Sequence, residues 1–508
     1  MMRQLFRNTV ISGGSLFLTS LMLLLVSPLI VRHWGLTEYG LIGLSRTFLL
    51  GFSGSLDLGV AEIVTMSVAR ARQNNNWSTA SIDLSLALWI TCSVGATVGL
   101  VLIGLSFYPE FFLKGELIYA SDVKLILVIS AFANMITFPG LIADGVLKGF
   151  ERFGTLRSVE LSQSLVYIVG VVAAAFANAP YTVVVYIAIG TIVFTNATKA
   201  LIAWRIGSRI GLKLTTVVPR DARREVGARA WLITQSKIIG AAQGPLLPVL
   251  LSWLFGPRAV GVYDILQRLP RAAKTILSLL NVALLPVSTR IEEADATEQR
   301  RRLGRIGMIL LPAITVPPLV ICAALSRPIL HVWIGTQVVD LWPWMAAMFA
   351  IPICAQYVSF GGVMAISRSV TLKKLNRISI LQLIIIAITV VVLVRVLQER
   401  SFMLGQALAW AISLPLQLVV LAPVFDLPLR SVGQAILTQL LLLLPALLLG
   451  ISYADSVYLD SPVGLAIASF VACLIVWVAE YLLMLQPPDR AEIKRLMTAV
   501  RRSPRLKA

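Results

Sequence analysis

Long apolar stretches recur along the whole chain, for example at 16–31, 380–394 and 435–449. A helix needs about 20 apolar residues to span a hydrocarbon core of about 30 Å. These stretches lack the polar–apolar alternation of a membrane β-barrel, so they predict helices. We expect fourteen spans, at residues 9–31, 39–64, 82–107, 122–147, 158–178, 181–204, 228–254, 262–287, 305–330, 341–366, 376–397, 402–425, 433–453 and 463–485.

The placement of basic residues orients these helices. The chain carries 44 Lys and Arg against 25 Asp and Glu, a formal net charge of +19. With the N-terminus inside, 31 of the 44 lie in or beside the inner segments and seven in or beside the outer ones. An excess of Lys and Arg on the cytoplasmic side is the rule that sets membrane topology. We therefore expect both termini in the cytoplasm, and we attribute the net charge to topology rather than to nucleic-acid binding.

The composition agrees with this class of protein. Of 508 residues, 57% are hydrophobic and 14% are charged, with a mean hydropathy of +0.85. A soluble domain carries about 25% charged residues. The longest connecting segment, 205–229, is too short for a separate folded domain. We expect an all-α polytopic membrane protein with no catalytic residue and no metal site.

An internal repeat predicts two similar halves. Gly35 and Gly40 open the span at 39–64, and Gly256 and Gly261 open the span at 262–287 with the same spacing. Six spans separate the two copies, so both have the same orientation. The repeat predicts six-helix lobes at 1–210 and 228–430, a basic cytoplasmic linker at 211–227, two extra helices at 431–486 and a basic cytoplasmic tail at 487–508.

The span at 262–287 has one polar side. Ionised side chains within a bilayer are expensive, so they face a cavity, a partner or the interface. At 100° per residue, the polar residues of this span fall within about 140° of one another, whereas leucines and isoleucines fill the other side. The polar residues are Asp264, Gln267, Arg268, Arg271, Lys274, Thr275, Ser278 and Asn281.

Two other spans carry sparser polar stripes. Tyr39, Arg46, Ser53 and Asp57 lie within about 40° of one line along the span at 39–64. Glu62 points away from that line, and we leave it aside. In the span at 228–254, Lys237 shares its stripe with small residues and a proline, which allow close helix packing or a bend.

Together these stripes predict a basic cavity for an anionic substrate. Five cations, Arg46, Lys237, Arg268, Arg271 and Lys274, outnumber the acids Asp57 and Asp264. The net positive charge of these seven residues is comparable in size to the negative charge of a diphosphate. Arg binds phosphate oxygens through two parallel hydrogen bonds. We assign Ser53, Gln267 and Asn281 to the polar lining. The alternative is that these residues neutralise one another or extend to the lipid headgroups; Asp264 and Arg268, at i and i+4, are expected to pair.

Several motifs in the same regions resemble one known family. HWGLTEYGL at 33–41, followed by LDLG at 56–59, resembles the G-x-x-x-Y/F-G … D-x-G opening of polysaccharide flippases. LKGFERF at 147–153 is similar to their L-x-G-x-x-R-F loop. FGPRAVGVY at 255–263 and VWIG at 332–335 continue the resemblance, which covers about residues 30–340. The family is the oligosaccharide flippases of the multidrug/oligosaccharidyl-lipid/polysaccharide exporter superfamily.

The resemblance implies two six-helix lobes around a central cavity and transport by alternating access. It implies a bacterial inner-membrane protein whose substrate is an undecaprenyl-diphosphate-linked oligosaccharide, a precursor of O-antigen, capsule or exopolysaccharide. Its partners would be that lipid-linked substrate, membrane lipids, and a polysaccharide polymerase with its chain-length machinery. Lipid II flippases of the superfamily have cavity arginines on spans one, two and eight; Arg46 and either Arg268 or Arg271 match the last two, and span one here has no cation after Arg7.

Energy coupling and alternative functions stay open at this point. Asp57 is a candidate carboxylate for H⁺ or Na⁺ as coupling ion, and pairing with Arg46 is an equal alternative; no other cofactor is expected. A multidrug antiporter of the same superfamily would be expected to have about twelve spans and an acidic cavity for cationic substrates. A membrane-embedded polymerase would need a large outer loop or paired carboxylates, and the chain has no phosphate-binding loop for an ATP motor. A non-transporting assembly component would not require the polar side at 262–287.

Overall fold

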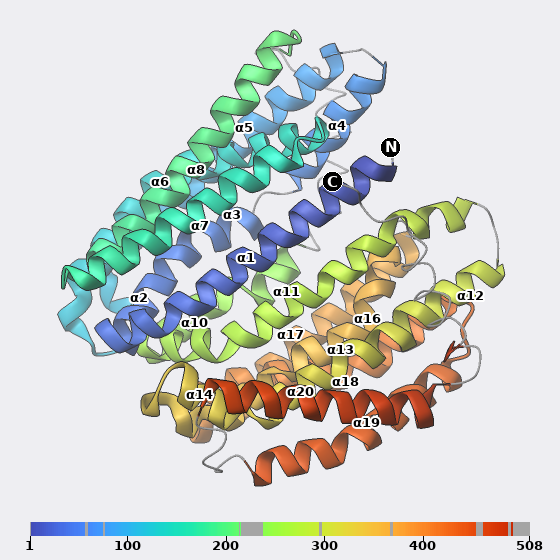
Figure 1. Ribbon diagram of the computed structural model, residues 1–508. Helices are drawn as coiled ribbons and strands as arrows, with labels where there is room; N and C mark the ends of the chain where they lie inside the picture. Colours follow the sequence, from blue (N-terminus) through green and yellow to red (C-terminus); the bar gives the residue numbers. More distant parts are fainter. Residues whose placement is uncertain are drawn as a thin grey trace. The chain divides into compact units, whose positions relative to one another are not determined.

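The computed structural model describes residues 2–55, 59–74, 77–212, 214, 237–293, 297–365, 369–453, 461–485 and 489–490, without the side chains of 2–12, 16, 54–55, 276–293, 363–365 and 369. Every element of regular structure in these ranges is a helix (Figure 1). The chain divides into two compact units, Met1–Ala272 and Ala273–Ala508, and the division falls within α11 (Pro257–Glu293).

The first unit packs its long helices around α6. Its helices are α1 (Met2–Trp34), α2 (Leu36–Arg46), α3 (Phe52–Ser55), α4 (Val60–Asn74), α5 (Trp77–Ser106), α6 (Ala120–Gly149), α7 (Phe153–Phe176), α8 (Tyr181–Arg209), α10 (Leu246–Phe255) and the start of α11. The π-helical segment η1 (Thr47–Gly51) joins α2 to α3. Helix α6 contacts α4, α5 and α8, and glycines allow the approach: a Cβ at Gly145 would lie 2.6 Å from the Ala61 carbonyl oxygen of α4.

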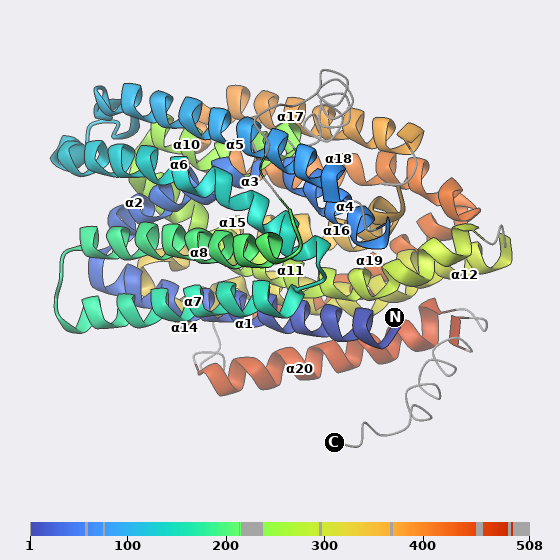
Figure 2. The same cartoon turned by 90° about the horizontal axis from the view of Figure 1, so that it is seen from above.

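The second unit is built around α13 (Leu311–Ala324). Its other helices are α12 (Thr297–Arg305), α14 (Ser326–Trp333), α15 (Trp342–Met348), α16 (Ala350–Ala365), α17 (Ser369–Leu397), α18 (Arg400–Leu421), α19 (Leu429–Ser452) and α20 (Pro462–Ala479). Two π-helical segments, η4 (Ile306–Leu310) and η8 (Glu480–Met484), extend α12 and α20. Helices α16, α19 and α20 all contact α13, and Figure 2 shows α20 at the edge of this group.

Twelve helices within the described residues are long and apolar enough to cross a membrane. They are Gly13–Trp34, Trp77–Ser106, Leu117–Gly149, Phe153–Phe176, Tyr181–Arg209, Lys237–Phe255, Thr297–Ala324, Thr336–Gly362, Val370–Leu397, Arg400–Phe425, Leu429–Ser452 and Pro462–Met484. Each coincides with one of the predicted spans. The prediction of an all-α, multi-pass membrane protein is confirmed.

Two predicted spans are missing from these twelve, 39–64 and 262–287, and both are among the three that carry polar stripes. The first is divided among α2, η1, α3 and α4. The second lies in α11, where Asp264, Arg268 and Arg271 lower the apolar content. The count of fourteen spans therefore stays a prediction. So do the lobe, linker and tail boundaries, since 215–236 and 491–508 lie outside the described residues.

Candidate functional site

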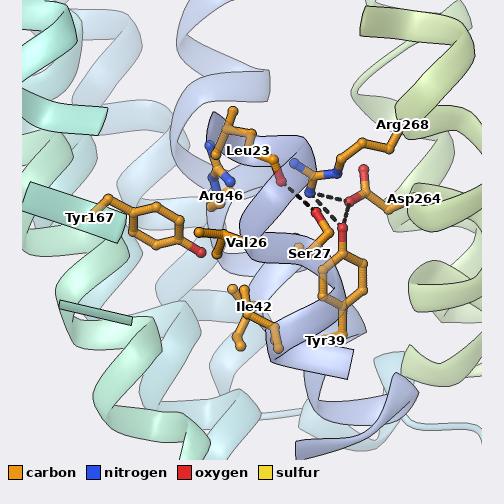
Figure 3. A pocket seen from close by; sticks show the side chains of 11 residues that line it. Leu23, Val26, Ser27, Tyr39, Ile42, Arg46, Tyr167, Asp264 and Arg268 are labelled. Atoms are coloured by element: carbon orange, nitrogen blue, oxygen red, sulfur yellow. Dashed lines mark hydrogen bonds and ion pairs between the residues drawn. The ribbon is translucent and has the colours of Figure 1, made fainter. Parts of the chain in front are cut away.

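Tyr39, Asp264 and Arg268 form a closed triangle of hydrogen bonds in the first unit (Figure 3). The Tyr39 hydroxyl donates to Oδ2 of Asp264 at 2.6 Å. One guanidinium nitrogen of Arg268 donates to the same carboxylate oxygen and to the Tyr39 oxygen, each at 2.6 Å. The expected pair of Asp264 with Arg268 is therefore present. Because each group satisfies the others, the triangle is stable within a membrane protein.

Glycines of the predicted repeat position the two helices that carry this triangle. Gly35 and Gly256 directly precede α2 and α11, with φ of 103° and 86°, a conformation that glycine adopts readily. Gly40 and Gly261 follow in the first turns of these helices. A Cβ at either position would overlap a backbone carbonyl oxygen of the other helix, so only glycine permits the contact. The repeat therefore marks the place where α2 and α11 touch.

Arg46 ends α2, ten residues after Leu36, which is about 15 Å along a helix. Its guanidinium carbon lies 5.1 Å from the centroid of the Tyr167 ring on α7, within cation–π range. Among the described residues, no carboxylate pairs with Arg46. Asp57, the acid expected on the same line, lies outside them. The positive charge of Arg46 therefore lies next to the aromatic ring of Tyr167.

Two small pockets meet at Arg46 and Tyr167. The first, of about 10 Å³, lies between Arg46 and the hydrogen-bonded triangle, and Ser27 of α1 contributes to it. The second, of about 30 Å³, adds Gln163, Ser164 and Thr191 from α7 and α8. A cavity needs about 10–15 Å³ of this kind of volume to hold one water molecule. In this conformation each pocket therefore has room for about one or two waters, and a phosphate or an oligosaccharide would need the helices to open further.

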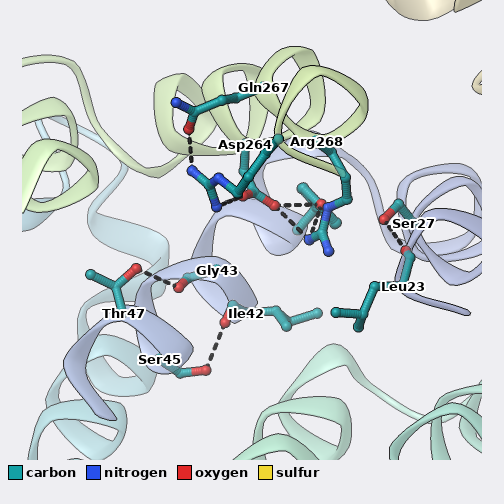
Figure 4. A network of polar contacts seen from close by, with 11 residues as sticks. Leu23, Ser27, Ile42, Gly43, Ser45, Thr47, Asp264, Gln267 and Arg268 are labelled. Atoms are coloured by element: carbon teal, nitrogen blue, oxygen red, sulfur yellow. Dashed lines mark hydrogen bonds and ion pairs between the residues drawn. The ribbon is translucent and has the colours of Figure 1, made fainter. Parts of the chain in front are cut away.

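Gln267 and Arg271 also belong to α11, and Figure 4 shows Gln267 near Asp264. Arg271 donates a hydrogen bond to the side-chain oxygen of Gln267, and its guanidinium lies 3.8 Å from Oδ1 of Asp264. The Arg271 side chain is 55% exposed. The guanidinium groups of Arg268 and Arg271 thus lie beside the Asp264 carboxylate, and Arg46 lines the same pocket. The described part of the site carries a formal surplus of two positive charges, which suits an anion.

Lys237 occupies a different place from this cluster. Its ammonium lies 3.0 Å from Oε2 of Glu62 on α4, the acid that sequence analysis left aside. The Glu62 side chain is 52% exposed. Sequence periodicity could show that Glu62 does not face Arg46, but it could not show which other helix it meets. The role predicted for Lys237 in substrate binding stays a prediction.

The other predicted site residues are spread along the chain. Lys274 belongs to the second unit, where its ammonium lies 4.9 Å from the centroid of the Trp410 ring. Ser53 is buried in α3, with 2% of its surface exposed. Asn281 falls within α11, but its side chain is outside the described residues, as is Asp57. The structure therefore brings together Arg46, Asp264, Gln267, Arg268 and Arg271.

Sequence analysis missed Tyr167 and a second charged cluster in the first unit. Lys199 of α8 is 6% exposed and lies 3.0 Å from both Asp144 of α6 and Glu160 of α7. Arg157 completes the cluster, 2.6 Å from Glu160. Two cations balance two carboxylates, so the cluster ties three helices together without surplus charge. Charged residues inside the spans at 122–147, 158–178 and 181–204 were the available signal.

Comparison with known proteins adds a family and a fold. Residues 5–292 match the family model described as polysaccharide biosynthesis protein. No match was found among curated proteins. The solved structure of the lipid II flippase MurJ, in an inward closed conformation, is 13% identical, with a TM-score of 0.63 over 93% of this chain and 99% of that one.

Two transporter structures are similar to the same degree. An inward-facing multidrug resistance MATE family transporter of the MOP superfamily is 13% identical, with a TM-score of 0.62 over 82% of this chain and 99% of that one. The MATE multidrug transporter DinF-BH is 15% identical, with a TM-score of 0.62 over 84% of this chain and 97% of that one. At such identities the likeness shows the fold alone.

The family match covers more than half of the chain, and it includes α2, α11 and the hydrogen-bonded triangle between them. The fold is shared with flippases and transporters of the superfamily that the sequence motifs resemble. The resemblance is therefore confirmed, and the chain belongs to the polysaccharide biosynthesis protein family.

Proposed function

We propose that this protein is a flippase for an undecaprenyl-diphosphate-linked oligosaccharide. It moves the lipid-linked sugar, a precursor of O-antigen, capsule or exopolysaccharide, from the cytoplasmic to the periplasmic or outer leaflet of the bacterial inner membrane. Both termini are cytoplasmic in this proposal, as the distribution of Lys and Arg predicts. The proposal adopts the alternating-access mechanism that the sequence resemblance implies, and it involves no catalytic step.

The observation that carries the proposal is the surplus positive charge around Asp264. Arg46, Arg268 and Arg271 lie in or beside helices of a membrane protein, where charged side chains are expensive unless they serve a function. A diphosphate carries negative charge that suits this basic site. Guanidinium groups bind its oxygens through paired, charge-assisted hydrogen bonds, which are stronger than neutral ones.

The three arginines have different parts in this proposal. Arg268 is hydrogen-bonded to both Asp264 and Tyr39, so its side chain is fixed in place. It attracts the substrate through its positive charge and does not move to contact it. Arg271 is the most exposed and meets the head group first. Arg46, next to the two pockets, receives a phosphate once the head group has entered. Lys237 and Lys274 remain proposed substrate contacts.

A multidrug antiporter is the second candidate, favoured by the fold shared with MATE transporters. Such a protein would carry organic cations. A site with three arginines and one described carboxylate would repel a cation, so its charge favours the flippase.

Translocation in proteoliposomes tests the proposal. The probe is a fluorescent undecaprenyl-diphosphate oligosaccharide, and the variants are Arg46→Gln and Arg271→Gln. Arg205→Gln is the matched control, because Arg205 is exposed at the end of α8, away from the site. Losing one charge-assisted hydrogen bond of about 1.5–3 kcal/mol predicts a roughly 10- to 100-fold loss of transport in the two site variants.

Two outcomes would contradict the proposal. Unchanged transport in both site variants would remove the arginines from substrate binding. Transport of a cationic dye by the wild type, with none of the lipid-linked probe, would favour the antiporter. Size-exclusion profiles that match the wild type show that each variant is folded.

A further inference from the structure

Glu480 is a buried carboxyl group in the second unit, away from the residues discussed above. It begins η8, directly after α20, and only 1% of its surface is exposed. Its Oε1 accepts a hydrogen bond from Nε2 of Gln439 on α19, at 2.8 Å. Its Oε2 is buried and has no hydrogen-bond partner among the described residues. One oxygen of a fully enclosed acid is therefore unsatisfied.

Gln439, the hydrogen-bond partner of Glu480, also forms hydrogen bonds with Tyr357 and Pro312. Gln439 accepts a hydrogen bond from the Tyr357 hydroxyl of α16 at 2.7 Å, which fixes the direction of its amide. The amide nitrogen then donates to the Pro312 carbonyl oxygen at 3.1 Å as well as to Glu480. Both of its hydrogens are used. Gln439 therefore cannot turn to supply Oε2 with a donor.

The charged groups near Glu480 have other described partners. Helices α13 and α20 contain no Asp, Glu, Lys or Arg, and the one such residue of α19, Arg430, is exposed. Arg305, the last residue of α12, forms a two-hydrogen-bond ion pair with Asp489. Arg490 donates hydrogen bonds to the carbonyl oxygens of Leu482 and Leu485 and lies 5.4 Å from the centroid of the Tyr481 ring. The remaining titratable groups on these elements are Tyr357 and Cys354 of α16, Cys322 of α13, Cys473 of α20 and Tyr481 of η8.

A buried carboxylate without an ion-pair partner has a large free-energy cost, and the neutral acid has a much smaller one. As a carboxylic acid, Glu480 keeps its Oε1 contact with Gln439 and leaves no charge in the apolar surroundings. A metal ion would need several oxygen ligands. Within the described residues, Oε2 is the one such atom here without a partner, so the site fits a proton and not a metal.

The helices around Glu480 depart from regular α-helical hydrogen bonding. Pro317 and Pro318 of α13 lack the N–H groups that would bond to the carbonyls four residues earlier. Trp477, one turn before Glu480, donates its indole N–H to one of these carbonyls, Ile314, at 3.1 Å. The π-helical segments η4 and η8 both contact α19. Such segments are rare and are frequent at functional sites.

We propose that Glu480 is a proton-binding site inside the second unit. In the packed arrangement described here, Glu480 is a neutral acid with its proton on Oε2. When α19 and η8 separate from α13, water reaches Oε2, the O–H bond breaks, the proton passes to water and the carboxylate is hydrated. Repacking reverses each step. If the proposed flippase function holds, this proton is the ion that drives transport, in place of one at Asp57.

Infrared difference spectroscopy of the purified protein tests proton binding without any transport assay. The wild type should show the C=O band of a protonated carboxylic acid near neutral pH, which weakens as the pH is raised. Glu480→Gln should lack that band. Glu298→Gln, the same change at an exposed position of α12, should keep it. The absence of the band from the wild type, or its persistence in Glu480→Gln, overturns the proposal.

If Glu480→Gln does not fold, a second variant can still test the proposal. Gln439→Met removes the hydrogen bond to Oε1 and should shift the frequency of the band. An unshifted band in Gln439→Met would assign it to another carboxyl group and would contradict the proposal.

Transport then tests what the proton does. A gradient of one pH unit shifts an equilibrium up to about tenfold for each coupled proton. It should increase accumulation of the lipid-linked probe in the wild type and have no effect in Glu480→Gln. If the wild type carries no probe while the band depends on Glu480, the proposed function fails and the proton site stands. Equal stimulation of both proteins would remove Glu480 from coupling.

Discussion

Gly40 and Gly261 lie against each other's helices at equivalent positions of the internal repeat. A Cβ added at Gly40 would lie 1.9 Å from the carbonyl oxygen of Pro257, and one at Gly261 would lie 2.1 Å from that of Leu36. The contact is reciprocal, since the first turn of each helix meets the first turn of the other. The proposed site, which begins with the hydrogen bond between Tyr39 and Asp264, is therefore built on a crossing of two backbones.

Alanine at either glycine should destabilise the protein. The overlap is with backbone atoms, so no side-chain rotation relieves it and the helices must move apart. Overpacking of this kind costs about 1–3 kcal/mol. Thermal unfolding in detergent should show a clearly lower Tm for Gly40→Ala and Gly261→Ala. Gly43→Ala is the matched control, since its Cβ would meet only Val260 Cγ1, at 3.9 Å. Equal Tm values for all three would contradict the crossing.

Removing the Tyr39 hydroxyl should weaken the triangle without breaking the ion pair. Tyr39→Phe leaves Arg268 bonded to Asp264 but deletes two hydrogen bonds to charged groups. The expected loss of unfolding free energy is about 1–3 kcal/mol. Chemical unfolding curves measure it, with Tyr186→Phe, at a position 45% exposed, as the control. A loss as small as that of the control would show that the hydroxyl is satisfied elsewhere.

Substitutions of Lys237 and Glu62 can distinguish a role of Lys237 in substrate binding from a structural role. Half-exposed ion pairs contribute about 0–1 kcal/mol, so Lys237→Gln and Glu62→Gln should both unfold close to the wild type. If Lys237 binds substrate, Lys237→Gln weakens binding of the lipid-linked probe and Glu62→Gln does not. Equal effects of both substitutions on binding would assign Lys237 a structural role.

Lys199 should be far more important for stability. Lys199→Met leaves two carboxylates, Asp144 and Glu160, without their shared cation, and breaking a buried pair in this way costs about 3–5 kcal/mol. The yield of folded protein and its Tm should both fall. Lys124→Met, at an exposed position of α6, should change neither. Adding Glu160→Gln to Lys199→Met should recover part of the loss, and no recovery would argue against the charge explanation.

The environment of Glu116, just before the Leu117–Gly149 span, predicts that the stability of the protein depends on pH. Burial, together with repulsion from Glu38, raises the pKa of Glu116 above its ordinary value of 4.5 despite the nearby Arg258. The folded state therefore holds this proton more tightly than the unfolded state. The resulting stability is present below pH 4.5 and is lost as the pH rises through the raised pKa.

Glu116→Gln should consequently reduce the loss of Tm between pH 4.5 and 7. Oε2 of Glu116 is buried and has no described hydrogen-bond partner. The substitution also replaces the ionisable carboxyl group there with a neutral amide. Tm measured across this range is the readout, and Glu110→Gln at an exposed position is the control. Parallel curves for wild type and Glu116→Gln would contradict the prediction.

Features set by local chemistry could be predicted from the sequence. The polar side of α11 follows from helix periodicity, and its pair of Asp264 with Arg268 follows from i, i+4 spacing. Contacts between distant helices could not be predicted this way. The partner of Lys237 depends on how α4 packs, and the ring beside Arg46 comes from α7. Glu480 passed unnoticed because a single acid at the end of an apolar run looks interfacial until its burial is known.

The polarity of α11 has a consequence for how the protein is made. Asp264, Arg268, Arg271 and Lys274 would together oppose entry of an isolated α11 into lipid by on the order of 10 kcal/mol. Helix α2, which forms hydrogen bonds with two of these charged groups through Tyr39 and contacts α11 at Gly40, leaves the ribosome more than 200 residues earlier. In the predicted fourteen-span topology, insertion of α11 by the translocon therefore depends on a tertiary contact with α2. A defect at Tyr39 or Gly40 would then appear first as wrong topology, and only afterwards as lost transport.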